Sequence, residues 1–524
     1  MTEYCCAFLL LLTLTSAPAL AVDSEEGPSL LTRPERTEYS ETSTLNDVTE
    51  FLQQLVERGA PIDLETLGIS AGGREIPLVI CANPMVDDGE AARASGRIVI
   101  YLQANIHGGE VEGKEVVQLL LREIASGEHG SWMEKFVLIV TPIYNVDGNE
   151  AWGDGLKNRG HQNGPARVGE RPNAARLDLN RDGTKAQSPE MRAALSGVYL
   201  TWDPHVVIDL HTTNGTRHGY TLTYSPPLHP DTDPNLLSFT RDMLLPEARK
   251  RMKKIGEATQ DYGNVDQRQE VRGWYTFSPL GRYVTNYVGL RNRIGILSEA
   301  TSYLPFKTRI LSTHRFVTSV LNLCEENTEA ISTLCEEADR RSEAGDLASL
   351  SLAFAPASRG EESVPLESRG QSRLPHQAPL ETADEVLPIF DRFIPASSRS
   401  VPTAYWIPGG ESRVIALLRR HGIEVVPCRT KVDLNAEEFV FDEVRRRGRP
   451  YQGHIIVEAE GSWRARELSK EVANSGYWVS CRQPLVRLVF ALLEPDQSDG
   501  IVAWSLLERA TSEKRPYPIR RILW

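Results

Sequence analysis

The sequence predicts an α/β fold in which a mixed, mainly parallel sheet is sandwiched between layers of helices. Continuous apolar, β-branched runs at 96–102 (GRIVIYL) and 135–143 (KFVLIVTPI) are typical of strands buried on both faces. A helical stretch over 111–124 separates these two runs. The same order of strand and helix recurs around the runs 205–210 and 293–297, as expected of an α/β sandwich.

Further elements flank this core. An amphipathic helix begins near residue 45, because apolar side chains recur at helical spacing on one face, namely Val48, Phe51, Leu52 and Leu55. A strand pair follows over 64–70 and 75–81, joined by the strong turn signal Gly72-Gly73. A long helix over 308–342 is expected to end the first folded unit.

Composition along the chain indicates two folded units. With 524 residues, 40% of them hydrophobic, the chain can bury one large core and at least one smaller core. Residues 22–44 are polar and predict a flexible lead-in, and residues 344–385 are rich in Ser, Pro, Gly and Glu and predict a low-complexity linker. These segments delimit a first domain over 45–343 and an accessory C-terminal domain over 386–524.

The N-terminus has the pattern of a signal peptide over residues 1–21. An apolar run ends in Ala19-Leu20-Ala21, the small-residue pattern at which signal peptidase cleaves, although Glu3 stands where a positive charge is usual. The alternative is an uncleaved anchor, but the run is shorter than the roughly 20 apolar residues of a membrane span. The sequence therefore predicts a protein exported to the periplasm or the extracellular space, with no stable membrane span after cleavage.

Charge and cysteine content exclude other classes of protein. The net charge of −13 argues against nucleic acid as a partner, because binding phosphates requires clustered Lys and Arg. Five cysteines would remain after signal cleavage, and no two have C-x-x-C spacing, which predicts neither a zinc ribbon nor a disulfide framework.

The segment 105–115 (NIHGGEVEGKE) lies where a buried strand gives way to a helix, and α/β sheets bind ligands at that end of their strands. His107 and Glu110 offer an imidazole and a carboxylate that can meet one ion, and His211 follows the strand 205–210 as a third ligand. Two histidines with one glutamate form a catalytic set for one Zn²⁺ ion with a position left for water. His205 precedes its strand and His218 lies in an expected loop, so both are interpreted as background.

Glu299 ends the apolar run that begins at residue 293. A carboxylate at the end of a buried strand is costly unless it is used or paired. Glu299 is therefore the candidate for the base that accepts a proton from the attacking water.

Four separated motifs together resemble the M14 family of zinc metallocarboxypeptidases over roughly residues 45–342. In chain order they are NIHGGEVEGKE, RPNAARLDLNRDGTK, DLHTTNG and ILSEATSY. The resemblance implies a zinc carboxypeptidase-like fold, with His107, Glu110 and His211 as the zinc ligands and Glu299 as the general base.

The middle motif implies further roles by the same resemblance. Asp178 corresponds to the carboxylate that orients the first zinc histidine, and Asn180 with Arg181 corresponds to the pair that grips the C-terminal carboxylate of a peptide. Arg171 corresponds to the stabiliser of the tetrahedral oxyanion, with Arg159 and Arg167 as rivals for that role.

The family's mobile tyrosine has three candidates here, Tyr275, Tyr283 and Tyr287, and residues 274–287 are expected to contribute to the specificity pocket. Asp182-Gly183 replaces the Asn and aromatic residue of the pancreatic enzymes, which favours a bacterial-type secreted branch with an extra C-terminal domain.

The sequence thus predicts a zinc-dependent hydrolase that removes C-terminal residues from peptides or proteins. One alternative is a zinc-dependent deacylase of the succinylglutamate desuccinylase–aspartoacylase type, which resembles the same site but lacks a D-x-N-R segment of this form. A non-catalytic binding protein on the same fold would have lost a ligand or the base, and none is missing. The C-terminal domain has only His421 and His454 as soft ligands, so it predicts no second catalytic site, and its partner is unidentified.

Overall fold

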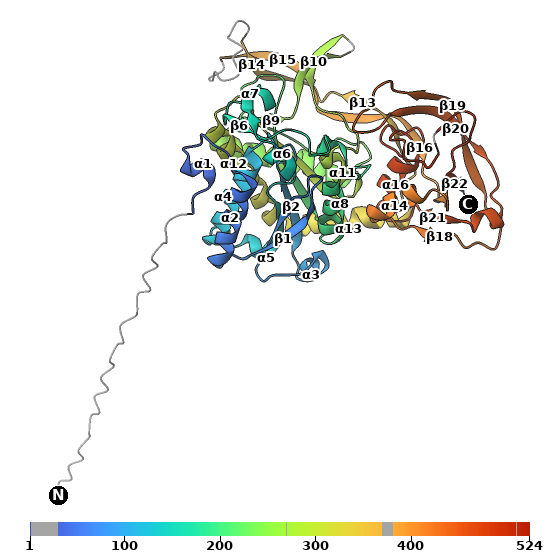
Figure 1. The fold of residues 1–524 in the computed structure, drawn as a ribbon, viewed down its shortest axis with the longest axis horizontal. Coiled ribbons are helices and arrows are strands. Elements are labelled where there is room, and N and C mark those ends of the chain that lie inside the picture. The colour runs from blue at the N-terminus through green and yellow to red at the C-terminus, as the bar shows by residue number, and fades with distance from the viewer. Residues whose placement is uncertain (2–29, 269, 369–380, 510, 524) are drawn as a thin grey trace. The chain divides into compact units, whose positions relative to one another are not determined.

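A computed structural model describes residues 1, 30–268, 270–368, 381–509 and 511–523. Residues 32–524 form one compact unit (Figure 1). The centre of this unit is an eight-stranded sheet in the order β1-β2-β4-β3-β7-β12-β8-β9. Its strands are β1 (Ile62–Ile69), β2 (Glu75–Cys81), β3 (Ile98–Ala104), β4 (Phe136–Thr141), β7 (Val206–Thr212), β8 (Leu222–Ser225), β9 (Thr259–Asp261) and β12 (Ile294–Ala300).

The sheet is mixed, with a parallel centre. Strands β4, β3, β7 and β12 run parallel, whereas β1 and β2 form an antiparallel hairpin and β8 pairs antiparallel with β12. Every residue of β3, β4 and β7 is buried, which explains why their sequences are continuously apolar instead of alternating. The predicted strands and the predicted hairpin are thereby confirmed.

Helices cover both faces of this sheet (Figure 1). On one side lie α2 (Leu45–Glu57), α4 (Glu112–Ala125) and α12 (Phe306–Glu326), which contact one another, and on the other lie α8 (Pro189–Ala194) and α11 (Val284–Leu290). The arrangement confirms the predicted α/β sandwich. The expected single helix over 308–342 is instead two helices, because α12 ends at Asn327 and α13 (Thr328–Ala344) begins after it.

The C-terminal residues build a six-stranded sheet in the order β18-β21-β17-β22-β19-β20. Its strands are β17 (Ala404–Pro408), β18 (Val426–Pro427), β19 (Ala436–Arg446), β20 (Val457–Ala465), β21 (Gly476–Ser480) and β22 (Arg520–Ile522). The same region contains helices α14 (Ser412–Arg420) and α16 (Val486–Leu493), and α16 contacts α11. Buried polar bonds join the two regions, among them Arg487 to Asn292 at 2.6 Å.

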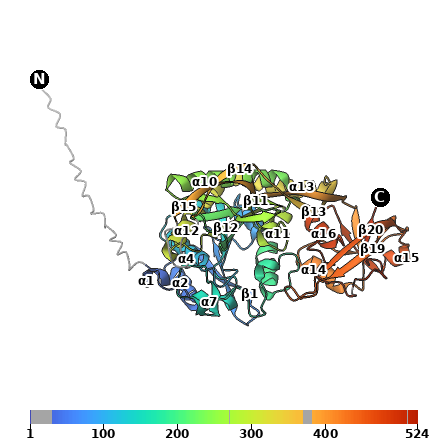
Figure 2. The same cartoon turned by 90° about the horizontal axis from the view of Figure 1, so that it is seen from above.

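The segment predicted as a linker contains strands in its described part. Strands β13 (Ser349–Ala357) and β14 (Glu361–Glu367) lie in it, and β15 (Thr382–Phe390) follows. β15 pairs with both β14 and β11 (Val271–Tyr275), so these strands extend a sheet that begins in the first domain (Figure 2). Alternate residues such as Val364 and Leu366 are buried against Trp274. Burial of every second side chain supplies enough apolar contact to hold a hairpin at the edge of the sheet, although the average composition of the segment is polar.

The described part of the expected lead-in is also packed. The Thr42 and Ser43 hydroxyls donate to the buried Glu115 carboxylate of α4 at 2.6 and 2.7 Å. Polar residues are ordered here because a buried acidic group needs their hydrogen bonds. The predicted signal peptide lies outside the described residues except for Met1, and the domain boundaries at 343 and 386 remain predictions.

Two further findings concern only the part of the chain that the structure describes. None of its helices is both long and apolar enough to cross a membrane. Its five cysteines are all buried thiols, at positions 81, 324, 335, 428 and 481.

A buried ion pair joins the helices that support the site. Arg309 of α12 contacts the Glu112 carboxylate of α4, and both side chains are fully buried. Arg309 also donates to the carbonyl oxygens of Asn163 and Gly164 at 2.7 and 2.6 Å. We expect Arg309→Met to lower the free energy of unfolding by about 3–5 kcal/mol, because it leaves the Glu112 charge buried without its partner.

Urea denaturation of the zinc-loaded protein measures this effect. The matched control is Lys307→Met, two residues before Arg309 on the exposed face of the same helix. Lys307 loses a cation–π contact with Tyr39 at 4.8 Å, so this control should change stability by no more than about 1 kcal/mol. Equal effects of the two substitutions would show that the ion pair is not a stabilising element.

Candidate active site

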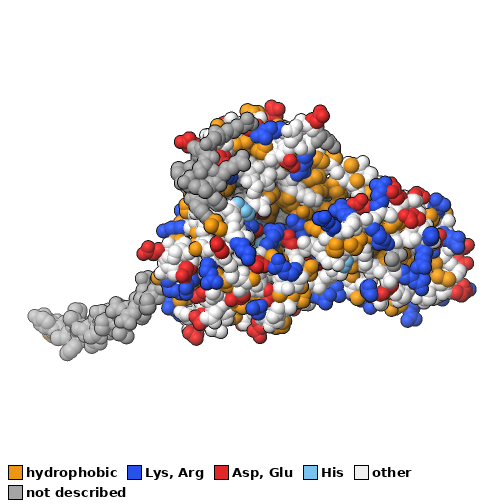
Figure 3. Space-filling model, turned by 45° about the horizontal axis from the view of Figure 1, so that its top comes forward, with side chains coloured by type: hydrophobic (Ala, Val, Ile, Leu, Met, Phe, Trp, Pro, Cys, Tyr) orange, Lys and Arg blue, Asp and Glu red, His pale blue; other side chains and the backbone are white. Residues whose placement is uncertain are grey.

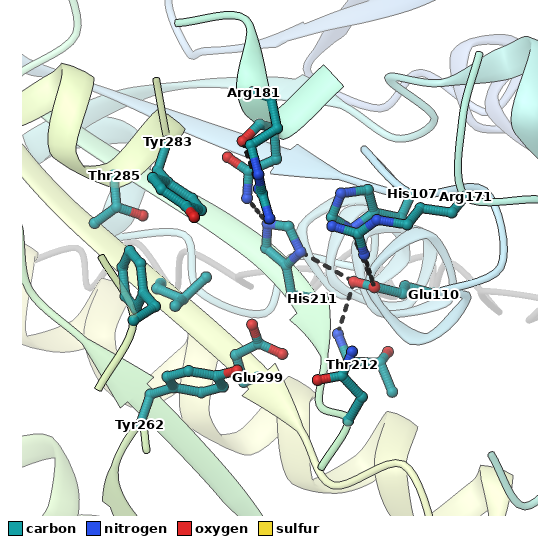
Figure 4. Close-up of a pocket in the computed structure, with 14 residues that line it drawn as sticks. His107, Glu110, Arg171, Arg181, His211, Thr212, Tyr262, Tyr283, Thr285 and Glu299 are labelled. Atoms are coloured by element: carbon teal, nitrogen blue, oxygen red, sulfur yellow. Dashed lines mark hydrogen bonds and ion pairs between the residues drawn. The ribbon is translucent and has the colours of Figure 1, made fainter. Parts of the chain in front are cut away.

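Three neighbouring parallel strands carry the predicted residues at their carboxyl ends (Figure 4). His107 and Glu110 follow β3, His211 lies near the end of β7, and Glu299 lies near the end of β12. Glu299 pairs in register with His211, so the two side chains start from adjacent positions of the sheet. The strand order alone therefore brings together residues that are almost 200 positions apart in the sequence.

The loop between β3 and α4 has a conformation that its residues make available. Asn105 has a φ of 58°, a left-handed conformation that Asn tolerates, and its Nδ2 donates to the Glu110 carbonyl at 2.8 Å. Gly108 lies so close to Gly148 that a Cβ atom would stand 2.1 Å from its carbonyl carbon. The glycine is required because the backbone of the loop packs directly on another backbone.

The two histidines present the same ring nitrogen to Glu110. His107 Nδ1 lies 3.0 Å from Glu110 Oε1, and His211 Nδ1 lies 3.0 Å from Glu110 Oε2. On the other side of each ring, His107 Nε2 contacts Asp178 Oδ1 at 3.0 Å and His211 Nε2 contacts Asp209 Oδ2 at 2.8 Å. A carboxylate only accepts, so a hydrogen on each Nε2 suits these contacts, and the Nδ1 atoms that face Glu110 are the ones that would bind an ion.

This donor set fits a metal ion. One ligand atom from each of His107, Glu110 and His211 lies within 4.8 Å of the others, and all three residues are buried. Two nitrogen lone pairs and a carboxylate that point at one another repel unless a cation or a proton lies between them. Although burial lowers the pKa of His211, the Asp209 and Glu110 carboxylates raise that pKa well above its ordinary value. The residues therefore suit Zn²⁺, whose preferred ligands are imidazole and carboxylate.

Three N–H donors contact the Glu110 carboxylate from different directions. Arg159 Nη1 donates to it at 3.0 Å, Arg171 Nη1 at 3.3 Å, and the Thr212 backbone N–H at 3.1 Å. Burial raises the pKa of Glu110, but His107 and Arg159 together hold it well below the usual range. Glu110 is therefore ionised throughout the neutral range, as a metal ligand must be.

The three candidate arginines differ in what they can reach. Arg159 is buried and also donates to the carbonyl oxygen of Thr212 at 3.0 Å, so its guanidinium is bonded to groups of the protein itself. Arg167 is exposed on the short strand β6 (Arg167–Val168) and does not line the cavity. Arg171 lines the cavity with a side chain that is 36% exposed, while Asp178 holds it at 2.8 Å. Of the three, Arg171 is the one that a substrate can contact.

Glu299 faces the same cavity, beside Tyr262 (Figure 4). Desolvation raises the pKa of Glu299 to about 8, while the positive charge of His211 acts in the opposite direction. A divalent cation among the three ligands would lower this pKa further, because an opposite charge favours the ionised form. Glu299 is thus placed to be a carboxylate when metal is bound.

Asn180 and Arg181 form the opposite wall of the cavity. The Asn180 side-chain oxygen accepts from the Val284 N–H at 2.9 Å, and its Nδ2 lies 3.5 Å from His211 Nε2. The Arg181 guanidinium stacks 4.2 Å over the ring of Tyr283. A planar guanidinium beside the Asn180 amide is well suited to binding a carboxylate.

The three tyrosine candidates are distinguished by their surroundings. Tyr275 is buried in a stack with Phe390, and Tyr287 is buried with its hydroxyl 2.8 Å from His421 Nδ1. Tyr283 alone among the three lines the cavity. His205 and His218 are also buried and stand outside the cavity lining, as the background interpretation expected; His205 Nδ1 accepts from the Val99 N–H at 3.0 Å.

Sequence reasoning missed several residues of the site. A hollow with Lys and Arg side chains at its rim opens on the face drawn in Figure 3. Phe277 and Thr285 line the cavity from the segment 274–287, as expected, but Thr212, Asn214, Tyr262 and Leu297 also line it and were not predicted. Asp209 was also missed, although its position two residues before His211 on one strand was a usable signal, since such residues share a face.

Residues 48–278 match a family model described as zinc carboxypeptidase. The carboxypeptidase 2 proteins of Trichophyton tonsurans and Trichophyton rubrum are 22% identical over 463 and 473 residues, with 82% of this chain and 77% of each relative covered.

Solved structures with a similar fold include a metallo-carboxypeptidase from Pseudomonas aeruginosa in complex with (2-guanidinoethylmercapto)succinic acid. It is 16% identical, with a TM-score of 0.40 over 55% of this chain and 70% of that chain. A metallo-carboxypeptidase from Burkholderia cenocepacia is 13% identical, with the same TM-score and coverage.

A buried set of two histidines and a glutamate at the edge of an α/β sheet, with a second carboxylate beside it, defines a metal-dependent hydrolase. Residues 48–278 are similar to the zinc carboxypeptidase family model, and this matched domain confirms the predicted peptidase class. The match ends at residue 278, so Glu299 lies beyond it, and the role of Glu299 depends on its register with His211.

Asp209 generates a prediction about metal affinity. Its carboxylate holds His211 and also accepts from Gln103 Nε2 at 3.1 Å. We expect Asp209→Asn to weaken zinc binding by about 10–100-fold, because the amide no longer fixes the tautomer and orientation of the imidazole. Competition with a chromophoric chelator measures the affinity, and Asp231→Asn, a carboxylate that caps Ser351 at 3.0 Å, is the control. Unchanged affinity in Asp209→Asn would exclude this role.

Proposed function

We propose that this protein is an exopeptidase that removes single residues from the free C-terminus of peptides or proteins. The observation that carries the proposal is the position of Asn180 and Arg181 in the same cavity as His107, Glu110, His211 and Glu299. A group that binds the terminal carboxylate inside this cavity places the last peptide bond of the substrate, and no bond further from the C-terminus, next to the metal ligands and Glu299.

His107, Glu110 and His211 would hold the zinc ion, which supplies Lewis-acid chemistry and lowers the pKa of water when it is bound. Glu299 accepts a proton from the attacking water on a carboxylate oxygen and returns it to the leaving amine. Arg171 stabilises the negative charge that develops on the carbonyl oxygen, because its guanidinium lines the cavity and is already oriented by Asp178.

The remaining cavity wall supports a preference for uncharged C-terminal side chains. Three of the lining residues come from the segment 274–287 that sequence analysis associated with specificity, namely Phe277, Tyr283 and Thr285. Leu297 and Tyr262 add apolar and aromatic surface. The charged residues of the lining all have a role as metal ligand, base, oxyanion stabiliser or carboxylate receptor, which leaves none to pair with a charged substrate side chain.

Export of the protein is part of the proposal. It is supported by the apolar run that ends in Ala19-Leu20-Ala21. Sequencing the N-terminus of the protein purified from its natural source would reveal cleavage after Ala21.

Substitution of Glu299 separates metal binding from turnover. We expect Glu299→Gln to retain one zinc ion while kcat falls by about 10²–10⁴-fold, because the amide cannot accept the proton from water. Metal analysis and peptide hydrolysis are measured on the same preparation. Near-normal hydrolysis by the zinc-loaded variant would show that another group is the base.

A panel of peptides that differ only at the last residue tests the substrate class. We expect peptides ending in aromatic or aliphatic residues to be cleaved faster than those ending in Lys, Arg, Asp or Glu, and C-terminally amidated peptides to react at least about tenfold more slowly. The matched variant is Arg181→Ala, which should raise KM for free peptides and abolish the difference from amidated ones. Equal cleavage of free and amidated peptides by the natural enzyme would contradict the exopeptidase assignment.

A further inference from the structure

One loop of the C-terminal region touches the substrate-binding motif of the catalytic domain. This loop, residues 447–456, connects β19 and β20 and is hereafter the β19–β20 loop. It reaches the segment 178–181 across more than 250 residues of sequence. The contact is made by two consecutive side chains, Tyr451 and Gln452.

The tip of the β19–β20 loop is held firmly by its own region. Tyr451 and His454 exchange two backbone hydrogen bonds, of 2.7 and 3.0 Å. The Tyr451 ring lies nearly parallel to that of Trp504, at 17°, and Trp504 is fully buried. His454 Nε2 in turn lies 2.5 Å from Gln187 Oε1. The loop is therefore a fixed support and does not hang freely over the cavity.

Both ends of the D-x-N-R segment rest on this support. The Gln452 side-chain oxygen accepts from the Asp178 backbone N–H at 2.8 Å, and the Tyr451 hydroxyl accepts from Arg181 Nε at 3.2 Å. Arg181 Nη1 donates to the Asn180 carbonyl at 2.8 Å. A guanidinium has five N–H donors, so holding Nε and one Nη1 hydrogen fixes its plane and leaves the others for a ligand.

The ring of Tyr283 lies on one face of the same guanidinium, at 4.2 Å. Arginine has a long side chain with much rotamer freedom, and freezing that freedom before substrate arrives strengthens binding without a new contact to the substrate. Tyr451 is not part of the cavity lining, so its effect on a substrate must act through Arg181.

From these contacts we propose that the C-terminal region is part of the substrate site, with Tyr451 and Gln452 as positioning residues that hold Arg181 ready for the terminal carboxylate. This inference rests on the proposed function, in which Arg181 binds that carboxylate. It assigns a catalytic purpose to a region that sequence analysis treated as accessory.

The inference predicts a specific kinetic signature. Tyr451→Phe removes the hydroxyl and keeps the ring against Trp504. We expect it to raise KM for a peptide with a free C-terminus by about three- to tenfold with kcat nearly unchanged, because the carboxylate is held equally in the ground state and the transition state. Gln452→Asn, which tolerates the left-handed φ of 49° and is too short to reach Asp178, should shift KM in the same direction.

The matched control is Tyr477→Phe, which removes a hydroxyl from β21 of the same region, where the ring contacts Arg419. It should leave both kinetic constants unchanged. In an Arg181→Ala background, Tyr451→Phe should have no further effect on KM. If Tyr451 had a merely structural role, its substitution would lower kcat or the active fraction both in the natural enzyme and in the Arg181→Ala variant.

The amidated peptide separates the two hypotheses. If the natural enzyme cleaves free and amidated peptides equally, the proposed function fails, whatever Tyr451→Phe does. If the natural enzyme discriminates between them and Tyr451→Phe leaves KM unchanged, or lowers kcat alone, the positioning role of Tyr451 is overturned while the proposed function stands.

Discussion

The ionised carboxylate of Glu110, buried at the carboxyl edge of the sheet, sets the arrangement around it. A lone carboxylate in such a place would be expensive, so the fold surrounds it with His107, His211, Arg159 and the Thr212 N–H. These partners come from the β3–α4 loop, from β7 and from the end of the short helix α7 (Gly155–Asn158), which Arg159 directly follows. One charge therefore fixes the relative position of three segments, and the cluster that satisfies it is also the set that binds a metal ion.

Most of the fold and the centre of the site could be predicted from the sequence because both depend on local patterns. Parallel strands buried on both faces have unmistakable apolar runs, and a polar residue directly after such a run must lie at the ligand-binding edge. His107, Glu110, His211 and Glu299 were all predicted in this way. The α4 and β12 segments were equally clear, since one shows helical periodicity and the other is continuously apolar up to Ser298.

What the sequence did not predict depends on pairings between distant residues. Tyr262 reaches the cavity from outside the recognised motifs and from outside the segment 274–287, and nothing near it in the sequence distinguishes it from other aromatic residues. The segment 344–385 was interpreted as a linker from its average composition. Strands form there because β15 pairs with the edge of β11, which only the tertiary structure reveals. Similarly, no local signal connects Tyr451 with Arg181, because a single hydrogen bond across 270 positions leaves no pattern in either segment.

The contact between the β19–β20 loop and the D-x-N-R segment also bears on how the protein is made. A chain is synthesised from its N-terminus, and domains tend to fold in that order. The central sheet could form once β12 has emerged, but the support for Arg181 would still be missing until the chain has passed residue 452. A partly synthesised chain would then hold its metal ligands together while its receptor for the substrate carboxylate stays loose. Full peptidase capacity would thus arrive only after residue 452 has been added, well after the central sheet has been synthesised.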